Sequence, residues 1–576
     1  MLKDIYDPLT EYINVFHDRF RDVCGTTFSE LADEAHIDVE ANQATCRKVY
    51  ATQEKLLNVK TRIGRWTFCS GLLWAGILAA VILSIVRHEE LGQGIYLLIL
   101  FAVAALFFLF LLVHPRIKKL KNDRRTLSDT LAKFKDEAWK QMSPLNRLYD
   151  WDILTRMMSA TVPKLEFDPY FTTQRLADLE MTYGWDGSFN KDRSVIYSHS
   201  GLINGNPFVI CRTRKMEMGT RTYYGSKTIY WTTQERDADG RYRTVQHSET
   251  LTASVTAPYP EYPEKTRLIY GNTAAPDLIF YRRKSGLAGK EGSLSYKWNR
   301  RALRKKARDL SNADFAMMTN EEFEVAFNTS DRNDNGQFAL LFTPLAQESM
   351  LKLLKDKKVG FGDDFDFEKR KMINTIVPQH MQQLNLDMDP RQYRSFDYNK
   401  AKQNFYAINS HCFRAIYFSL APLLCIPMYQ QIRPYQDIYG LDMKRHSAFW
   451  EHEALANFWG QEHFRHPSCV TDCILKTDQR ENRDDSSVIS VQAYGYRSMQ
   501  RLTYISRWGG DGRSHNVPVY WDEYLPVTGS GEMHIQEDND LKDTDMSQRQ
   551  RLDHINSVLD RSDLDLYRRH IASGLN

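Results

Sequence analysis

Two apolar segments near the N-terminus stand out against the mixed polar and apolar pattern of the rest of the chain. Residues 66–86 read WTFCSGLLWAGILAAVILSIV, and residues 95–113 read IYLLILFAVAALFFLFLLV. Neither segment contains a charged residue. A helix of about 20 apolar residues crosses the roughly 30 Å of hydrocarbon in a bilayer. The pattern therefore predicts two membrane-spanning helices.

The residues around this pair predict its orientation. Residues 87–94 form a short link, so the two helices are expected to return as an antiparallel hairpin. Arg87 is the only Lys or Arg in the link. The outer flanks carry many more, namely Arg47, Lys48, Lys55, Lys60, Arg62, Arg65, Arg116, Lys118, Lys119, Lys121, Arg124 and Arg125. Because basic residues favour the cytoplasmic side, we expect both termini and the bulk of the chain in the cytoplasm. The lack of ionisable residues within the spans indicates an anchor rather than an ion pathway.

Polar helices are predicted on both sides of the hairpin. Residues 1–65 have the spacing of amphipathic helices, with a break expected at residues 25–27. Residues 114–145 form the second helical segment, with Leu127 and Phe134 on its apolar stripe. Two hypotheses remain open for these segments, an antiparallel coiled coil and separate surface helices.

The remainder predicts a soluble α+β region, so the fold class is an α+β membrane protein. Residues 146–310 alternate β-branched or aromatic residues with polar ones, which is typical of antiparallel strands, and Asn204-Gly205 and Asp239-Gly240 are hairpin turns. Residues 311–527 predict an α+β domain, with a buried strand at 337–343, a helix opened by Pro344 and strands within 361–377.

Two further segments complete the predicted organisation. Residues 415–428 are apolar but short and contain Pro422, so they are expected to be buried core rather than a third span. Residues 528–576 predict a polar tail with a terminal helix.

Composition excludes several classes of protein. The 576 residues are 42% hydrophobic with a net charge of +3, which argues against a polytopic transporter and gives no general attraction to nucleic acid. The eight cysteines are scattered and are expected to be reduced rather than to form a disulfide framework. No phosphate-binding loop, dinucleotide fingerprint or nucleophile-elbow motif occurs, so no cofactor is expected.

A group of histidines and cysteines is the candidate metal site. Zinc accepts both kinds of ligand, and the candidates are His463, His466, Cys469 and Cys473, with His446, Glu451 and His452 nearby in sequence. Cys469 and Cys473 would face the same way if they lay on one helix. The alternative is that these are hydrogen-bonded polar residues without a metal.

Two loops have partial motif matches. Residues 331–336 begin like a calcium-binding loop, but the twelfth position is Phe342 instead of an acid, so a tight turn is expected. Residues 509–512 read GGDG, as in lipid kinases of the diacylglycerol kinase type, but Arg513 follows where those enzymes have Thr. A β-turn is the expected structure there.

One segment is strongly basic. Its cationic residues are Lys297, Arg300, Arg301, Arg304, Lys305, Lys306 and Arg308, with Trp298 among them. A solvated helix face, a site for anionic lipid head groups and a nucleic-acid site are the three hypotheses. We weigh nucleic acid least and expect no nucleic-acid partner.

The segments Glu322-Phe323-Glu324-x-x-Phe327 and Leu340-Leu341-Phe342-Thr343-Pro344 resemble elements of a bacterial membrane family of unknown function. The resemblance covers about residues 1–380 and implies a bacterial inner-membrane location. It implies a LemA-type membrane protein as a partner, and it supplies no catalytic residues. Residues beyond 380 depart from the family's compact pattern.

These observations favour a membrane-anchored cytoplasmic scaffold or interaction protein that binds membrane lipids and forms homo-oligomers. The alternative is a membrane-tethered enzyme with an unrecognised, metal-dependent site around residues 446–473. A pore formed by oligomers of the hairpin is the third hypothesis, and the uncharged spans argue against it. No catalytic residue is predicted, and the sequence favours a protein that is not an enzyme.

Overall fold

The computed structural model describes residues 4–86, 94–236, 241–308, 315–432, 446–482, 486–538, 546–558 and 566–575. The fold is of the mixed α+β class, as expected. The chain forms two compact units, of which the first comprises residues 1–24, 150–389 and 408–576. The second comprises residues 25–149 and 390–407. The link at residues 87–93 and the turn expected at Asp239-Gly240 lie outside the described residues.

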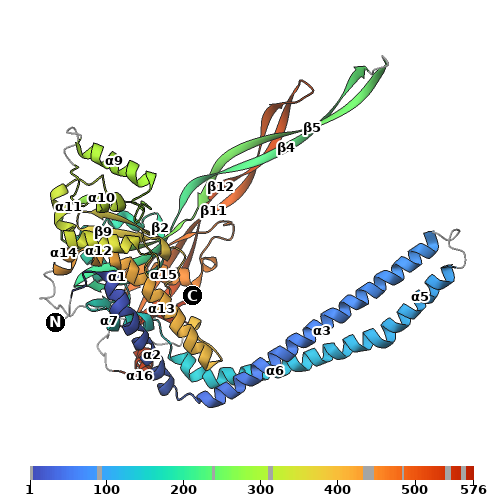
Figure 1. The fold of residues 1–576 in the computed structure, drawn as a ribbon, viewed down its shortest axis with the longest axis horizontal. Coiled ribbons are helices and arrows are strands. Elements are labelled where there is room, and N and C mark those ends of the chain that lie inside the picture. Colours follow the sequence, from blue (N-terminus) through green and yellow to red (C-terminus); the bar gives the residue numbers. More distant parts are fainter. Residues whose placement is uncertain are drawn as a thin grey trace. The chain divides into compact units, whose positions relative to one another are not determined.

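The second unit is built on long helices (Figure 1). Helix α3 (Val39–Val86) has 48 residues, which corresponds to about 70 Å at about 1.5 Å per residue. The chain returns through α5 (Gly94–Phe108), the π-helical turn η2 (Leu109–Val113) and α6 (His114–Leu148). Both apolar segments are therefore helical, and α3 is far longer than a bilayer is thick.

Helices α3 and α6 run side by side in opposite directions (Figure 1). The Gln141 amide nitrogen donates to Thr45 Oγ1 at 3.1 Å. Nearer the apolar segments, Arg116 lies over the Trp66 ring at 5.8 Å. The two flanking segments therefore pack on one another rather than lying apart, while the regular side-chain interlocking of a coiled coil stays a prediction.

The break expected at residues 25–27 is absent. After α1 (Pro8–Glu11) and η1 (Tyr12–Phe16), helix α2 (His17–Glu34) continues through Gly25. Cys24 and Phe28 are buried on either side of this glycine, and their packing offsets the roughly 1 kcal/mol that glycine costs a helix. The chain turns only at His36, which has a positive φ of 50°.

The first unit contains a seven-stranded antiparallel sheet of order β1-β2-β3-β6-β9-β8-β7. Its strands are β1 (Leu165–Phe167), β2 (Arg193–Ile203), β3 (Asn206–Lys215), β6 (Glu264–Gly271), β7 (Ile279–Arg282), β8 (Phe365–Arg370) and β9 (Ile373–Pro378). The predicted turn at Asn204-Gly205 is confirmed, with φ of 53° and 80°. Because β9 pairs with β6, this sheet crosses the domain boundary expected at residue 310.

A second sheet has the order β10-β11-β12-β14-β13. Its strands are β10 (Ile474–Asn482), β11 (Ser486–Trp508), β12 (Ser514–Glu537), β13 (Leu566–Arg568) and β14 (Ile571–Leu575). The expectation that residues from 528 onward form a polar tail is therefore wrong. Strand β12 continues to Glu537, helix α16 (Gln548–Val558) follows, and β14 pairs with β12.

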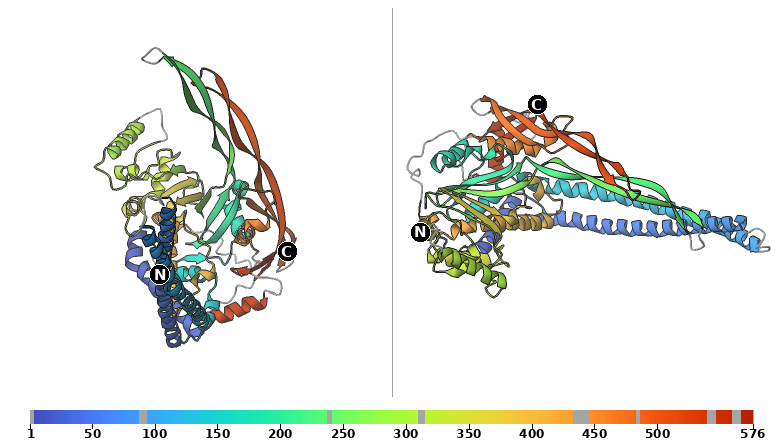
Figure 2. Two further views of the ribbon diagram at one scale, coloured as in Figure 1. Left: turned by 90° about the vertical axis from the view of Figure 1, so that its right-hand side faces the viewer. Right: turned by 90° about the horizontal axis from the view of Figure 1, so that it is seen from above.

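Two long β-hairpins form an arm of the first unit. Strands β4 (Glu217–Arg236) and β5 (Tyr242–Glu261) pair along their whole length and pack against the distal part of β11–β12. Figure 2 shows the two hairpins side by side from other directions. Ile229, Leu251, Ala253, Val517 and Val519 form the buried core between them. We call residues 217–261 and 497–525 the β arm.

Short helices cover the sheets of the first unit. They are α7 (Ile153–Thr161), α8 (Thr173–Ala177), η3 (Asp178–Thr182), η4 (Gly187–Asn190), α9 (Leu294–Arg308), α10 (Glu321–Phe327), α11 (Asn335–Leu341), α12 (Pro344–Lys355), η5 (Gln379–Met381), α14 (Pro427–Gln431), α15 (Phe449–Trp459) and η8 (Gln461–His463). The turn η6 (Pro390–Tyr393) belongs to the second unit, and α13 (Tyr398–Leu424) belongs to both.

The apolar segment at 415–428 is buried core, as expected. Tyr417, Leu420 and Leu424 in α13 are each at most 2% exposed. The Tyr417 hydroxyl donates to the carbonyl oxygen of Pro8 at 2.8 Å. These contacts are those of a helix inside a folded body.

The strand expected at 337–343 is instead helix α11. The Asp334 carboxylate accepts a hydrogen bond from the Gln337 backbone nitrogen at 2.9 Å, which caps the helix N-terminus. Phe338 and Phe342 then pack with their ring centroids 4.6 Å apart. They join a cluster that also contains Phe280, Phe323, Phe327 and Phe367. The expected helix opened by Pro344 is confirmed as α12.

Helix and strand make different predictions for residues 338 and 340. In a strand these two side chains would share one face, whereas in α11 Phe338 is buried and Leu340 is 61% exposed. We expect Phe338→Ala to lower the free energy of unfolding by about 3–5 kcal/mol. Leu340→Ala should change it by less than about 0.5 kcal/mol. Chemical denaturation of both variants checks this, and equal losses would contradict the helix.

Candidate functional site

The residues of the candidate metal site do not assemble. His463 and His466 are exposed, and His466 Nδ1 accepts from the Ser468 backbone nitrogen at 3.1 Å. Cys469 and Cys473 both lie in the loop before β10, so the facing that a shared helix would give them does not apply. Among the described residues, no group of three or more His, Cys, Asp or Glu side chains is placed to hold a metal.

The two cysteines nevertheless meet. Their Sγ atoms are 3.6 Å apart, and both side chains are buried against β11 at Gly495. A Cβ atom added to Gly495 would lie 2.6 Å from Cys469 Sγ, so only glycine leaves room for the pair. Burial raises the pKa of the Cys473 thiol to about 12. All eight cysteines are free thiols.

Glu451 and His452, two other members of the group, make hydrogen bonds within the first unit. The buried His452 ring contacts Ser447 Oγ at 2.9 Å, and burial lowers the pKa of His452 to about 4. The Glu451 carboxylate accepts from the Phe171 backbone nitrogen at 2.9 Å and from Ser198 Oγ at 3.0 Å. These side chains hold α15 against β2.

The partial motifs have the structures that the turn hypotheses predict. Asp331 and Asn333 accept hydrogen bonds from backbone nitrogens of β7, at Tyr281 and Ile279. The GGDG segment is the tight turn between β11 and β12, with Gly512 at a φ of 73°. Neither segment gathers the side chains of a binding site among the described residues.

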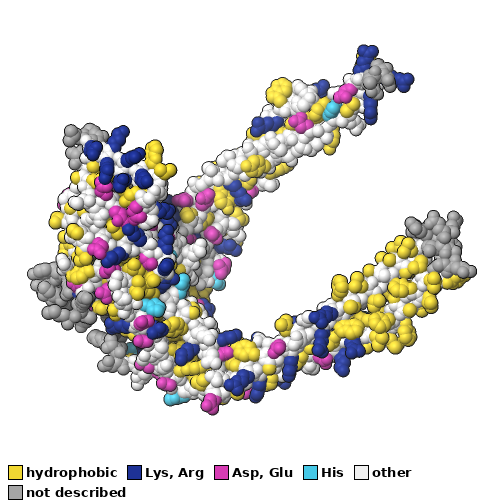
Figure 3. Space-filling model, viewed as in Figure 1, with side chains coloured by type: hydrophobic (Ala, Val, Ile, Leu, Met, Phe, Trp, Pro, Cys, Tyr) yellow, Lys and Arg dark blue, Asp and Glu magenta, His cyan; other side chains and the backbone are white. Residues whose placement is uncertain are grey.

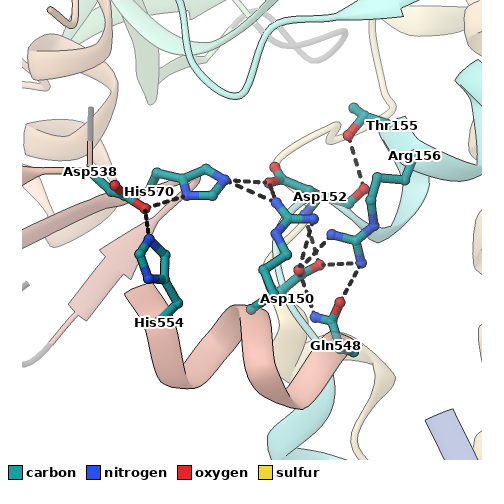
Figure 4. Close-up of polar contacts among 9 residues, drawn as sticks. Asp150, Asp152, Thr155, Arg156, Asp538, Gln548, His554 and His570 are labelled. Atoms are coloured by element: carbon teal, nitrogen blue, oxygen red, sulfur yellow. Dashed lines mark hydrogen bonds and ion pairs between the residues drawn. The ribbon is translucent and has the colours of Figure 1, made fainter. Parts of the chain in front are cut away.

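Sequence reasoning missed a buried ionic cluster of the first unit (Figure 4). Asp150 and Asp152 stand just before α7. Asp150 accepts from Arg156 Nη1 at 2.8 Å and from the Gln548 amide nitrogen at 2.6 Å. Asp152 forms an ion pair with Arg551 of α16. The cluster therefore ties the start of α7 to α16.

His570 extends this cluster to the last two strands. Its Nε2 lies 3.4 Å from Asp152 and its Nδ1 lies 3.4 Å from Asp538, which follows β12. His554 of α16 approaches the same Asp538 carboxylate at 4.0 Å. Figure 4 shows His570 pointing between the two carboxylates. We call Asp150, Asp152, Arg551, His570 and Asp538 the ionic latch, because their contacts join the start of α7 to the C-terminal segment.

The charges of the latch determine what chemistry it can perform. Burial by itself lowers the pKa of His570, but its contacts with Asp152 and Asp538 outweigh burial and raise the pKa to about 9. Burial opposes ionisation of Asp152, but His570 and Arg551 hold the pKa of Asp152 well below its usual range. Burial raises the pKa of Asp150 to about 6 against the opposing effect of Arg551. The raised pKa favours the protonated imidazole at neutral pH, which is a poor general base, while Arg551 Nη2 lies 2.9 Å from His570 Nε2 and opposes this protonation.

No local sequence signal could have revealed this cluster. Gln548 and Asp150 are 398 positions apart, and Arg551 and Asp152 are 399 apart. Residues 549–570 contain five arginines and two histidines, but nothing in this segment indicates their partners.

The basic segment forms helix α9, as expected. Tyr296 and Leu303 are buried on one side of the helix, and its cations lie mainly on the other sides. Arg304 forms an ion pair with Glu321 at 2.7 Å. Lys306 donates to the carbonyl oxygen of Ser330.

Several motif residues behind the family resemblance belong to the core, although Leu340 is exposed. Phe323, Phe327 and Phe342 lie in the phenylalanine cluster. Glu324 is 1% exposed and forms an ion pair with Arg332 at 2.7 Å. Thr343 caps α12 by accepting from the Ala346 backbone nitrogen. These residues build structure and do not surround a described binding site.

The latch predicts a pH-dependent stability. A histidine whose folded pKa is about 9 and whose ordinary value is 6.5 stabilises the fold fully below pH 6.5, and this contribution is lost as the pH rises through 9. The difference corresponds to about 3 kcal/mol. We expect His570→Gln to lower the thermal unfolding midpoint most at pH 6 and progressively less toward pH 9. The exposed His463→Gln is the control, and a constant difference for His570→Gln across this pH range would contradict the latch.

Comparison of the chain with protein-family models, with curated proteins and with solved structures finds no match.

Proposed function

We propose that this chain is a membrane-anchored cytoplasmic scaffold or interaction protein that assembles with copies of itself. The observation that carries the proposal is the apolar surface of α3 and α5. Exposed side chains include Phe68 at 69%, Leu78 at 65%, Leu97 at 71% and Phe107 at 66%. Figure 3 shows apolar side chains covering this part of the helix pair, with Lys and Arg along the part before it. Soluble proteins rarely expose contiguous apolar patches larger than a few hundred Å².

The inner faces of the two helices support a hairpin anchor. Ile77, Ala105 and Leu109 are buried between the helices, and the Phe101 ring lies beside Gly76. Each helix has a segment long and apolar enough to cross a bilayer. Small residues at such a contact allow close packing where lipid supplies no hydrophobic driving force. Basic flanks at both outer ends favour a cytoplasmic location for both termini.

The β arm supports the interaction role. The outward positions of β4 are Thr220, Thr222, Tyr224, Ser226, Thr228, Tyr230, Thr232 and Gln234. Those of β5 are Thr244, Gln246, Ser248, Thr250, Thr252, Ser254 and Thr256. All are exposed and none is charged, and the charge-free run ends at Arg236, the next outward position of β4. Hydroxyl groups pair across the strands, as between Thr222 and Thr256 at 3.1 Å.

A second copy of the chain is the occupant that this face fits. In a symmetric contact the same patch meets itself, so a patch that carried charges of one sign would face like charges. The uncharged face avoids this repulsion. Within the described residues β4 pairs only with β5, and long edges of this kind are templates for pairing with another chain. The exposed Tyr224 and Tyr230 supply the large aromatic side chains that are enriched at interfaces.

The anchor is tested by a charge placed on the exposed apolar face. Leu78→Arg combined with Leu100→Arg should reduce the membrane fraction that resists alkaline extraction, since each arginine costs about 2.5–3.5 kcal/mol at a span centre. Leu57→Arg is the matched control, because Leu57 is 63% exposed on α3 but lies before the apolar segment. Release of the unchanged protein by alkaline extraction would overturn the anchor.

Assembly is tested by the mass of the purified protein in mild detergent. We expect a multiple of the chain mass, and Tyr224→Lys with Tyr230→Lys should weaken association at least about tenfold through like-charge repulsion. Met181→Lys is the control, because Met181 is 86% exposed outside the β arm. A monodisperse monomer without a stoichiometric partner would contradict the scaffold. Partner identification in the same preparation tests for the LemA-type protein.

A further inference from the structure

Helix α9 has one buried face and one unpartnered face. Its sequence, LSYKWNRRALRKKAR, contains no acidic residue. Tyr296 and Leu303 pack into a small core with Leu287, Phe315 and Val325. This packing fixes the rotation of the helix, so the side chains that point outward are determined.

The outward face combines cations with large apolar side chains. Leu294, Trp298, Arg301, Lys305 and Arg308 follow one another at intervals of three or four positions and so form one stripe. Leu294 is 75% exposed and Trp298 is 72% exposed. Figure 3 shows Lys and Arg gathered over α9.

The cations of this stripe have no acidic partner among the described residues. Arg304 and Lys306, which flank the stripe, are engaged by Glu321 and by the Ser330 carbonyl oxygen. Arg301, Lys305 and Arg308 have no ion pair within the part of the chain that the structure describes, which excludes 309–314. The stripe therefore presents positive charge outward.

We propose that the outward face of α9 binds anionic lipid head groups on the surface of the membrane in which the chain is anchored. The proposal rests on the anchor proposed above. Charge complementarity selects an anionic partner, since each Lys or Arg near an anionic leaflet attracts it. The exposed Leu294 and Trp298 select a bilayer over nucleic acid, because an aliphatic side chain and an indole beside cations insert at the head-group boundary.

The test places an environment-sensitive fluorophore on the stripe. Cys69 is exposed and the other cysteines are buried, so Cys69→Ser with Leu294→Cys gives one labelling position in the full chain. The labelled protein is reconstituted into nanodiscs of phosphatidylcholine alone or of phosphatidylcholine and phosphatidylglycerol in equal amounts. We expect blue-shifted, brighter emission only with phosphatidylglycerol, and loss of this change at high salt.

Variants and controls separate the outcomes. Arg301→Glu with Lys305→Glu should abolish the change, whereas Arg507→Glu with Arg513→Glu, at exposed positions of the β arm, should keep it. Equal emission in both lipids, or an unchanged response in the α9 variant, overturns the proposal. A response to single-stranded RNA in phosphatidylcholine discs without a response to phosphatidylglycerol also overturns it in favour of nucleic acid. Failure of the protein to co-elute with either disc contradicts the anchor instead.

Discussion

Water cannot solvate the outer surface of α3 and α5 without a large free-energy penalty, and the organisation of the second unit depends on this constraint. Large apolar side chains cover the outside of both helices, while the small seam of Ile77, Ala105 and Leu109 holds them together. This arrangement is the reverse of that in a soluble protein, because the more apolar surface of the helix pair faces outward. An apolar environment would remove this penalty, which agrees with the anchor proposed above. The basic residues of α3 and α6 then begin where the apolar surface ends.

Polar groups inside the first unit are organised differently, because there each charge needs a partner within the protein. Glu324 and Arg332 form one buried pair, and Arg282 and Asp363 form another. The latch at Asp150, Asp152, Arg551 and His570 follows the same rule. Removing one member of a buried pair costs about 3–5 kcal/mol, because it leaves an uncompensated charge. These pairs therefore specify which segments lie together more than they add net stability.

The β arm and α9 present side chains that the packing of the first unit does not use. The arm has an uncharged face of hydroxyl and tyrosine side chains, and α9 has a stripe of cations with Trp298 and Leu294. Both faces are backed by buried side chains, the arm by the core around Ile229 and Val519 and the helix by Tyr296 and Leu303. Such preorganised surfaces lose little side-chain freedom on binding, which favours association.

The sequence by itself determined the features that depend on local pattern. The two apolar helices, the hairpin turn at Asn204-Gly205, the helix after Pro344 and the basic helix α9 follow from hydrophobic periodicity, turn chemistry and capping. Tertiary structure decided the rest. Residues 335–341 are apolar enough for a strand, but the Asp334 cap and the phenylalanine cluster make them a helix. The last ten described residues have the sequence of a tail, but β14 within them pairs with the edge of β12. The ionic latch joins residues almost 400 positions apart, which no local pattern can encode.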